Sequence, residues 1–191
     1  MKTVLVTGSS SGLGKSIIEK YASMGYNTII TYNNNMDAAE KLNSYIREKY
    51  KVNSEFYKLD ITDEESINSL VTSLKKEYSN IDVLVNNAGI ALDNLYTNKS
   101  KSEFLKVVTT NLVGTFLVTK AFSSWMYECK TGVIINISSN NSIDSYYSES
   151  IDYDASKAGI NNMTHNFANI LSPYIRVNAV CPGWIDTPMN D

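Results

Sequence analysis

The stretch Thr7-Gly8-Ser9-Ser10-Ser11-Gly12-Leu13-Gly14 joins a short β-branched run at residues 4–7 to an amphipathic stretch at residues 14–24. Glycines let the backbone turn tightly and approach a pyrophosphate, and the next helix N-terminus offers free N–H groups and a positive dipole end. A strand before the turn and a helix after it are the context that a dinucleotide-binding turn requires; an ordinary polar βα turn is the alternative. We predict that this turn binds phosphates through Gly8, Ser10, Gly12, Leu13 and Gly14.

Strand and helix patterns continue to alternate along the chain. Alternation of this kind predicts βαβ units with a parallel sheet, and nearly all-apolar strands agree because helices cover both faces of such a sheet. We predict an α/β fold with a doubly wound parallel sheet (a Rossmann fold), three α/β/α layers and six strands, in a single domain over residues 1–191. The further strands are expected at residues 28–31, 55–59, 81–85, 133–137 and 175–180, and the further helices at 38–49, 64–77 and 104–125.

Helix starts have weaker signals. Thr62 with Glu65 three positions on is a capping-box pattern. Ser102, before Phe104, is a second candidate cap. Tyr153 is expected to open the last helix.

The composition fits one globular domain and excludes several functions. Of the 191 residues, 43% are hydrophobic and 19% are charged, and the formal net charge is −3. A mildly acidic chain offers no electrostatic surface for nucleic acid or an anionic membrane, and no apolar run is long enough to span a bilayer. We therefore expect neither nucleic acid nor a membrane among its partners.

The N-terminus and the cysteines indicate a cytoplasmic protein. Residues 1–8 run into the glycine-rich turn without a small-residue cleavage site, so we expect a buried first strand and not a signal peptide. Cys129 and Cys181 are far apart and are expected to be reduced thiols. A single histidine, His165, and two scattered cysteines predict no metal site, and they argue against a Ser-His-Asp or Cys-His hydrolase unless His165 is the base.

Polar residues follow several predicted strands at their carboxyl ends, where open α/β sheets bind ligands. Asn86-Asn87-Ala88-Gly89 follows the strand at 81–85, and Asp60-Ile61 follows the strand at 55–59. For Asp60, a ligand contact on the one hand and a helix-capping or solvated carboxylate on the other are equally good interpretations. Asn111 lies inside a predicted helix, where its residue type alone predicts an exposed side chain.

Tyr153 and Lys157 are one helical turn apart in Tyr153-Asp154-Ala155-Ser156-Lys157, so their side chains share one helix face. A free tyrosine has a pKa of about 10, and a nearby ammonium favours the phenolate and lowers that pKa. We therefore expect Tyr153 to exchange a proton with a substrate oxygen. Ser138 and Ser139 follow the strand at 133–137, and either hydroxyl can point into the same crevice.

Taken in order, these motifs resemble those of the short-chain dehydrogenase/reductase family. The resemblance covers essentially the whole chain and is closest to 3-oxoacyl-[acyl-carrier-protein] reductases and related carbonyl reductases. The matching motifs are T-G-x-x-x-G-x-G at 7–14, N-N-A-G at 86–89, N-I-S-S at 136–139, Y-x-A-S-K at 153–157 and P-G at 182–183.

The resemblance implies an NAD(P)(H)-dependent oxidoreductase that transfers a hydride between nicotinamide and a carbonyl or secondary alcohol, with 3-oxoacyl-thioester reduction as one such reaction. Tyr153 then donates the proton, and Ser139 orients the same oxygen. Lys157 lowers the tyrosine pKa and holds the nicotinamide ribose, and Asn111 holds a water of the proton relay. The further cofactor contacts it implies are Asn33, Asp60, Ile61, Asn87, Ala88, Gly89, Pro182, Gly183, Ile185 and Thr187.

The end of the strand at 28–31 indicates which cofactor is used. An acid there binds the ribose 2′-hydroxyl and repels a 2′-phosphate. The sequence continues as Tyr32-Asn33-Asn34-Asn35 and has no acid before Asp37. We therefore predict NADP in preference to NAD, although no arginine or lysine is present there to hold the phosphate.

Two features depart from the family pattern. The strip at 140–154 is polar and acidic, which indicates either a polar or cationic substrate or a solvated lid edge. The resemblance also implies a substrate loop, a helix and a seventh strand beyond the P-G turn. Since the sequence ends at Asp191, we expect this chain to lack them.

Two other functions fit the same motifs. One is a catalytically silent nicotinamide-binding sensor or scaffold. The other is epimerisation or dehydration, which related enzymes carry out with the same tyrosine and lysine. In every case the resemblance implies a homodimer or homotetramer for the full-length protein.

Overall fold

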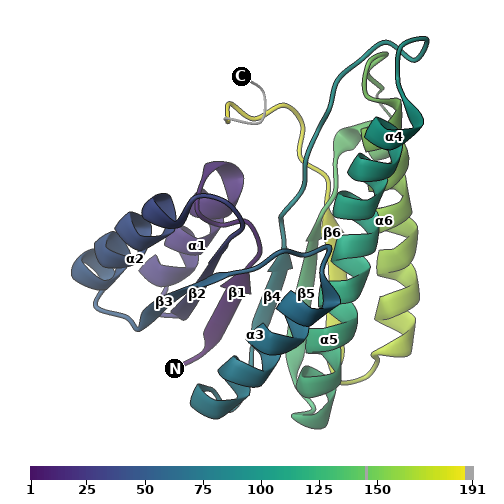
Figure 1. Cartoon of the computed structure of the whole chain (residues 1–191). Coiled ribbons are helices and arrows are strands. Elements are labelled where there is room, and N and C mark those ends of the chain that lie inside the picture. The colour runs from purple at the N-terminus through teal and green to yellow at the C-terminus, as the bar shows by residue number, and fades with distance from the viewer. Residues whose placement is uncertain (145, 188–191) are drawn as a thin grey trace.

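Six parallel strands form one twisted sheet in the part of the chain that the computed structural model describes, residues 1–144 and 146–187 (Figure 1). Their order across the sheet is β3-β2-β1-β4-β5-β6. Every predicted strand overlaps an observed one, which confirms the doubly wound parallel fold. The strands are β1 (Thr3–Val6), β2 (Asn27–Tyr32), β3 (Ser54–Lys58), β4 (Val83–Asn86), β5 (Gly132–Ile137) and β6 (Ile175–Val180).

Helices cover both faces of the sheet and complete the three layers (Figure 1). The first two helices pack on one face, and the later ones pack on the other. Successive residues of β1 therefore point into different cores: Val4 and Val6 face the first layer and Leu5 faces the second. The helices are α1 (Gly12–Ser23), α2 (Met36–Tyr50), α3 (Glu64–Glu77), α4 (Lys101–Val108), α5 (Thr115–Glu128) and α6 (Ile151–Ile170).

The edge strand β6 departs from the expectation of nearly all-apolar strands. Ile175 and Val177 are buried in the core beneath α5 and α6. Arg176, Asn178 and Val180 alternate with them and are exposed. In the described residues, helices cover only one face of β6, so its burial follows the two-residue period of a half-covered strand.

The helix expected at 104–125 changes geometry midway. A π-helical segment, Thr109–Gly114, separates α4 from α5. Such segments are rare and occur frequently at functional sites. This one brings Gly114 so close to Ile61 that a Cβ on the glycine would lie 2.8 Å from Ile61 Cδ1. It also turns Asn111 inward, where its side chain is fully buried, so the exposed position expected for Asn111 is wrong.

The capping box predicted at Thr62 is wrong. Asp63 caps α3, and its carboxylate accepts the Glu65 N–H at 3.0 Å. Thr62 instead donates its N–H and its hydroxyl to Asp60, at 2.9 and 2.7 Å. The cap therefore lies one residue later than the capping-box pattern predicts, whereas α3 itself spans the predicted residues 64–77.

Two other helices begin earlier than the sequence predicts. Ser100, and not Ser102, caps α4 in a reciprocal capping box with Glu103. α6 begins at Ile151, two residues before Tyr153. Tyr153 therefore lies inside the first turn of α6, where the helix backbone fixes its direction.

The carboxyl ends of the parallel strands gather along one edge of the sheet, and the chain beyond β6 passes over this edge (Figure 1). Among the described residues, no helix is long and apolar enough to cross a membrane.

Candidate active site

A cleft of about 1080 Å³ lies along the carboxyl edge of the sheet. Strand order reverses between β1 and β4, and chain segments leaving these two strands diverge and leave a crevice. Every residue predicted to bind the cofactor lines this one cleft. They are Gly8, Ser10, Gly12, Leu13, Gly14, Asn33, Asp60, Ile61, Asn87, Ala88, Gly89, Tyr153, Lys157, Pro182, Gly183, Ile185 and Thr187.

The glycine-rich turn is shaped to bring its backbone against the cleft. Gly8 and Gly12 have φ angles of +64° and +53°, a region that side chains rarely adopt. The buried Ser9 hydroxyl fixes the turn, because it donates to Val6 O at 2.8 Å and accepts the Thr31 N–H at 3.0 Å. Ser11 precedes α1 and makes no side-chain cap hydrogen bond. The first amides of α1 are therefore not capped by this side chain and suit an anion such as a phosphate.

Thr7 holds this turn against the segment that follows β4. Its Oγ1 accepts the N–H groups of Asn87 and Ala88 at 2.9 and 3.0 Å. The Asn87 side-chain amide donates back to Thr7 O at 2.9 Å. Gly14 also lies close to Asn87, because a Cβ at Gly14 would be 2.5 Å from Asn87 Nδ2. The backbone thus forms a narrow cradle that a dinucleotide fits and that an added methyl group would fill.

Asp60 lies at the end of the cleft nearest β2 and β3. Hydrogen bonds from the Thr62 hydroxyl and the Thr62 N–H, and a weaker one from Asn33, hold its pKa below the usual range. The carboxylate is therefore ionised and held in place at neutral pH. The helix-cap interpretation of Asp60 is wrong, since α3 is capped by Asp63.

Tyr153 and Lys157 lie at the other end of the cleft, on one face of α6 as predicted. Lys157 is 4% exposed, its Nζ lies 5.4 Å from the centre of the Tyr153 ring, and it donates to Ile137 O at 2.8 Å. The Ser139 side chain lies close enough to Tyr153 to act on the pKa of its phenol. Ser138 instead donates to Lys157 O at 3.0 Å, so it faces the helix backbone. Of the two serines, Ser139 is the one that meets the tyrosine.

The electrostatics of this pair differ from the expectation. Burial raises the pKa of Tyr153, the nearby Asp154 and Asp93 add to the rise, and the Ser139 side chain opposes it. The expected lowering by Lys157 is not found. Burial also lowers the pKa of Lys157, to about 8, and its ammonium lies beside the tyrosine ring. Tyr153 is therefore a neutral phenol at pH 7, which suits a proton donor better than a base.

Asn111 lies beneath the cleft and not among the residues that line it. Its Oδ1 accepts the Ile90 N–H at 2.8 Å, and its Nδ2 donates to Ile90 O at 2.9 Å and to Ser156 Oγ at 3.1 Å. Both amide hydrogens and one oxygen lone pair are thus in use. Asn111 clamps the backbone of Ile90, which does line the cleft.

Several lining residues were not predicted from the sequence. The segment between β4 and α4 contributes Ile90, Ala91 and Asp93. The rings of Tyr147 and Trp184 also line the cleft and meet edge to face, with centroids 5.7 Å apart. Ile90, Ala91 and Asp93 could have been found, because they lie in a long connection that follows the carboxyl end of a central strand. The aromatic pair had no local signal, because its members are far apart in sequence.

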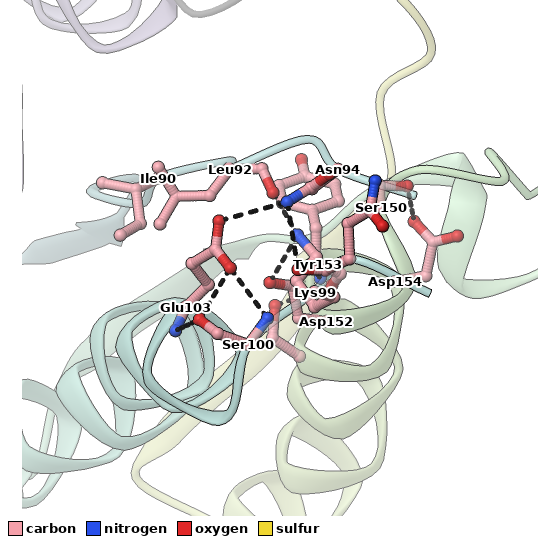
Figure 2. A network of polar contacts seen from close by, with 12 residues as sticks. Ile90, Leu92, Asn94, Lys99, Ser100, Glu103, Ser150, Asp152, Tyr153 and Asp154 are labelled. Atoms are coloured by element: carbon pink, nitrogen blue, oxygen red, sulfur yellow. Dashed lines mark hydrogen bonds and ion pairs between the residues drawn. The ribbon is translucent and has the colours of Figure 1, made fainter. Parts of the chain in front are cut away.

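The acidic strip at 140–154 is largely occupied by local contacts. Asp154 accepts hydrogen bonds from Ser150 Oγ and Asn141 Nδ2, both at 2.9 Å. Asp152 is fully buried and forms an ion pair with Lys99 (Figure 2). Asp152 therefore belongs neither to a solvated lid edge nor to an open acidic surface.

The fold and the cleft together define an α/β enzyme domain with a dinucleotide site beside a tyrosine, a lysine and a serine. The chain matches the short chain dehydrogenase family over residues 2–191, and it belongs to that family, the short-chain dehydrogenases/reductases. Its family chemistry is nicotinamide-dependent hydride transfer.

Individual relatives agree with this assignment. The chain is 38% identical to 3-oxoacyl-[acyl-carrier-protein] reductase FabG of Aquifex aeolicus, covering 98% of this chain and 75% of the relative. It is 33% identical to an NADP-dependent mannitol dehydrogenase of Alternaria alternata, covering 100% and 73%. The crystal structure of levodione reductase superposes with a TM-score of 0.93 at 31% identity, covering 98% and 73%.

Replacing Gly14 with alanine should weaken cofactor binding. The new Cβ would lie 2.5 Å from Asn87 Nδ2 and 2.6 Å from Gly8 O, so the cradle must open. We expect the Kd for NADPH, measured by fluorescence titration, to rise by about tenfold or more, equivalent to about 1.4 kcal/mol. Gly25→Ala is the control, since Gly25 has a positive φ but open space around it. This variant should lower the stability of the fold and leave the Kd for NADPH unchanged. An unchanged Kd in Gly14→Ala would contradict the cradle.

Replacing Lys157 with methionine should stabilise the fold while removing activity. The folded pKa of about 8 lies below the ordinary 10.5, so the unfolded chain binds more protons between these values. The penalty of the buried charge is therefore full below pH 8 and disappears as the pH rises towards 10.5. After allowing for the lost bond to Ile137 O, we expect a gain of about 2 kcal/mol at pH 7 in urea unfolding.

This gain should disappear as the pH rises and become a loss of about 1 kcal/mol by about pH 11, since the lysine is then neutral in both states and only the lost bond to Ile137 O remains. Lys106→Met is the matched control, because Lys106 also lines the cleft but is exposed. A Lys157→Met variant that is less stable than the parent at pH 7, or whose gain does not depend on pH, would contradict the assigned burial penalty.

Proposed function

We propose that this protein is an NADPH-dependent carbonyl reductase in which Tyr153 is the proton donor. The observation that carries the proposal is the half-buried, neutral Tyr153 phenol, which lies beside Ser139 at one end of a cleft whose other end is the glycine-rich cradle. A nicotinamide bound in the cleft supplies the hydride for the carbonyl carbon. The forming alkoxide then takes its proton from the Tyr153 hydroxyl.

Ser139 orients the oxygen that receives the proton. Its Oγ accepts the Asn141 N–H at 3.2 Å and donates to Asn140 Oδ1 at 3.4 Å, a long hydrogen bond that the substrate oxygen would replace. Lys157 supplies a cation beside the tyrosine, stabilises the phenolate left after proton transfer and holds the nicotinamide ribose. Asn111 has an indirect role, because it fixes the backbone of Ile90 beside the reacting groups.

The proposed cofactor preference rests on the end of β2. Asn33, Asn34 and Asn35 line the cleft there and carry no negative charge that would repel a 2′-phosphate. Among the described residues that line the cleft, the lysines are Lys106 and Lys157. The asparagine amides are therefore the donors that we propose for the 2′-phosphate.

The substrate class follows from the relatives by analogy. We propose 3-oxoacyl thioesters as the first substrates to test, because a relative that is 38% identical over 98% of this chain is a 3-oxoacyl-[acyl-carrier-protein] reductase. We further propose a single cofactor-binding domain in a cytoplasmic homodimer or homotetramer. Exposed apolar side chains on the α4–α5 side, Leu105, Val113 and Phe116, supply a surface for such assembly.

Tyr153→Phe should remove turnover and leave cofactor binding intact. The variant keeps the ring but loses the proton donor, so we expect kcat for ketone reduction to fall by a factor of about 10²–10⁴. The Kd for NADPH should stay within a factor of about three. Tyr96→Phe, at a 73% exposed tyrosine, should change neither quantity. Turnover retained in Tyr153→Phe would overturn the assignment; a parent protein that binds NADPH but reduces no ketone would indicate a silent sensor.

Asn33→Asp should change the cofactor preference. A carboxylate at this position would bind the ribose 2′-hydroxyl of NADH and repel the 2′-phosphate of NADPH. We expect the ratio of kcat/KM for NADPH to that for NADH to fall by about tenfold or more. Asn53→Asp introduces the same charge at an exposed site just before β3, at the opposite edge of the sheet, and should leave the ratio unchanged. A parent that prefers NADH would contradict the proposed cofactor.

A further inference from the structure

A buried ion pair lies beside the reacting groups without taking part in the proton transfer described above. Lys99 Nζ and Asp152 Oδ2 are 3.0 Å apart, and their side chains are 3% and 0% exposed (Figure 2). Among the described residues, Lys99 is the one polar partner of Asp152 Oδ2. The other ion pairs of the described chain are at the surface.

The pair joins the β4–α4 connection to the helix that carries Tyr153. Asp152 immediately precedes Tyr153 in the first turn of α6, and its Oδ1 accepts the Tyr153 N–H at 2.9 Å. Lys99 immediately precedes the cap of α4, and its Nζ also donates to Leu92 O. One ammonium thus contacts both Leu92 in the connection and the carboxylate next to the proton donor.

The β4–α4 connection depends on such ties, because residues 87–99 form no regular helix or strand. Asn94 provides a second tie, since its N–H donates to Glu149 O at 2.9 Å and its side chain reaches Glu103 (Figure 2). Ile90 and Asp93 of this connection line the cleft together with Tyr153. The distance between this wall and the tyrosine is therefore set by contacts across the two segments.

A buried ion pair is a poor source of stability. Desolvation of two charges cancels most of their attraction, and apolar replacements of similar volume are often equally stable. Such a pair can instead fix the relative position of two segments, because each buried charge is tolerated only where it contacts its partner. Lys99 and Asp152 thus define one relative position of the loop wall and α6.

We propose that Lys99 and Asp152 are positioning residues that hold the loop wall of the cleft at a fixed distance from Tyr153, and so set the geometry of the carbonyl substrate. The inference rests on the proposed function. The tie acts on the substrate end of the cleft, whereas the phosphate cradle is built by other segments. Loss of the tie therefore lowers kcat/KM for the ketone and leaves cofactor affinity unchanged.

The test compares Lys99→Met, the double variant Lys99→Met/Asp152→Asn and Lys99→Arg. Lys99→Met leaves a bare buried carboxylate, so both Tm and kcat/KM should fall. The double variant removes both charges, and Asn keeps an oxygen for the Tyr153 N–H. Its Tm should recover more than half of the loss, while kcat/KM for the ketone stays at least tenfold low and the Kd for NADPH stays within twofold. Lys99→Arg should keep most of the activity.

The surface pair Lys120 and Glu64, with 61% and 64% exposed side chains, gives the matched control. Lys120→Met/Glu64→Gln should alter neither Tm nor kcat/KM. A double variant at Lys99 and Asp152 whose activity recovers together with its Tm would overturn the proposal, because the pair would then be merely structural. A loss of NADPH affinity in parallel with activity would overturn it as well.

Hydrogen exchange separates this proposal from the function on which it rests. In the double variant the amides of 88–94 and 147–153 should exchange at least tenfold faster, while those of 8–14 keep their rates. Unchanged exchange at 88–94 would overturn the positioning role. If the parent reduces no ketone, the carbonyl reductase assignment fails, and the exchange result still decides whether the pair holds the two segments together.

Discussion

The hydroxyl of Thr7 is the contact on which the cleft depends. It accepts N–H groups from Asn87 and Ala88, and it lies where the strand order reverses between β1 and β4. Parallel strands ending at such a point leave a crevice by topology alone, but the width of the crevice must still be set. Thr7 sets it by fixing the glycine-rich turn against the β4 end. The positive φ of Gly8 and the missing side chain of Gly14 are consequences of that closeness.

The two ends of the cleft are built on different physical principles. The end beside the glycine-rich turn is formed by backbone amides and glycines. The end beside Tyr153 contains buried charges: Lys157, which burial brings to a pKa of about 8, and the Lys99–Asp152 pair. Buried charges reduce stability unless they are paired. Their concentration around Tyr153 fits a site where stability is given up for function.

Local patterns predicted the fold well, and long-range contacts account for the errors. Strand periodicity and the glycine-rich turn are local, and both were found where expected. The bounds of α3 were predicted correctly, but its cap was assigned to Thr62, which instead bonds Asp60 after the preceding strand. The buried position of Asn111 depends on a π-helical segment and on Ile90, 21 residues away. The rise in the pKa of Tyr153 depends on burial, which an i,i+4 spacing with Lys157 does not reveal. The Lys99–Asp152 pair links residues 53 positions apart, and neither has a local signal.

In the proposed reaction, nicotinamide bound in this cleft delivers a hydride to a carbonyl carbon. The most direct measurement uses NADPH deuterated on one face of the nicotinamide C4, with a 3-oxoacyl thioester or a simple ketone as acceptor, and mass spectrometry of the alcohol. We predict one deuterium on the carbinol carbon from one C4 face and none from the other. An alcohol without deuterium from either face, or the same labelling from both, would contradict the proposed reaction.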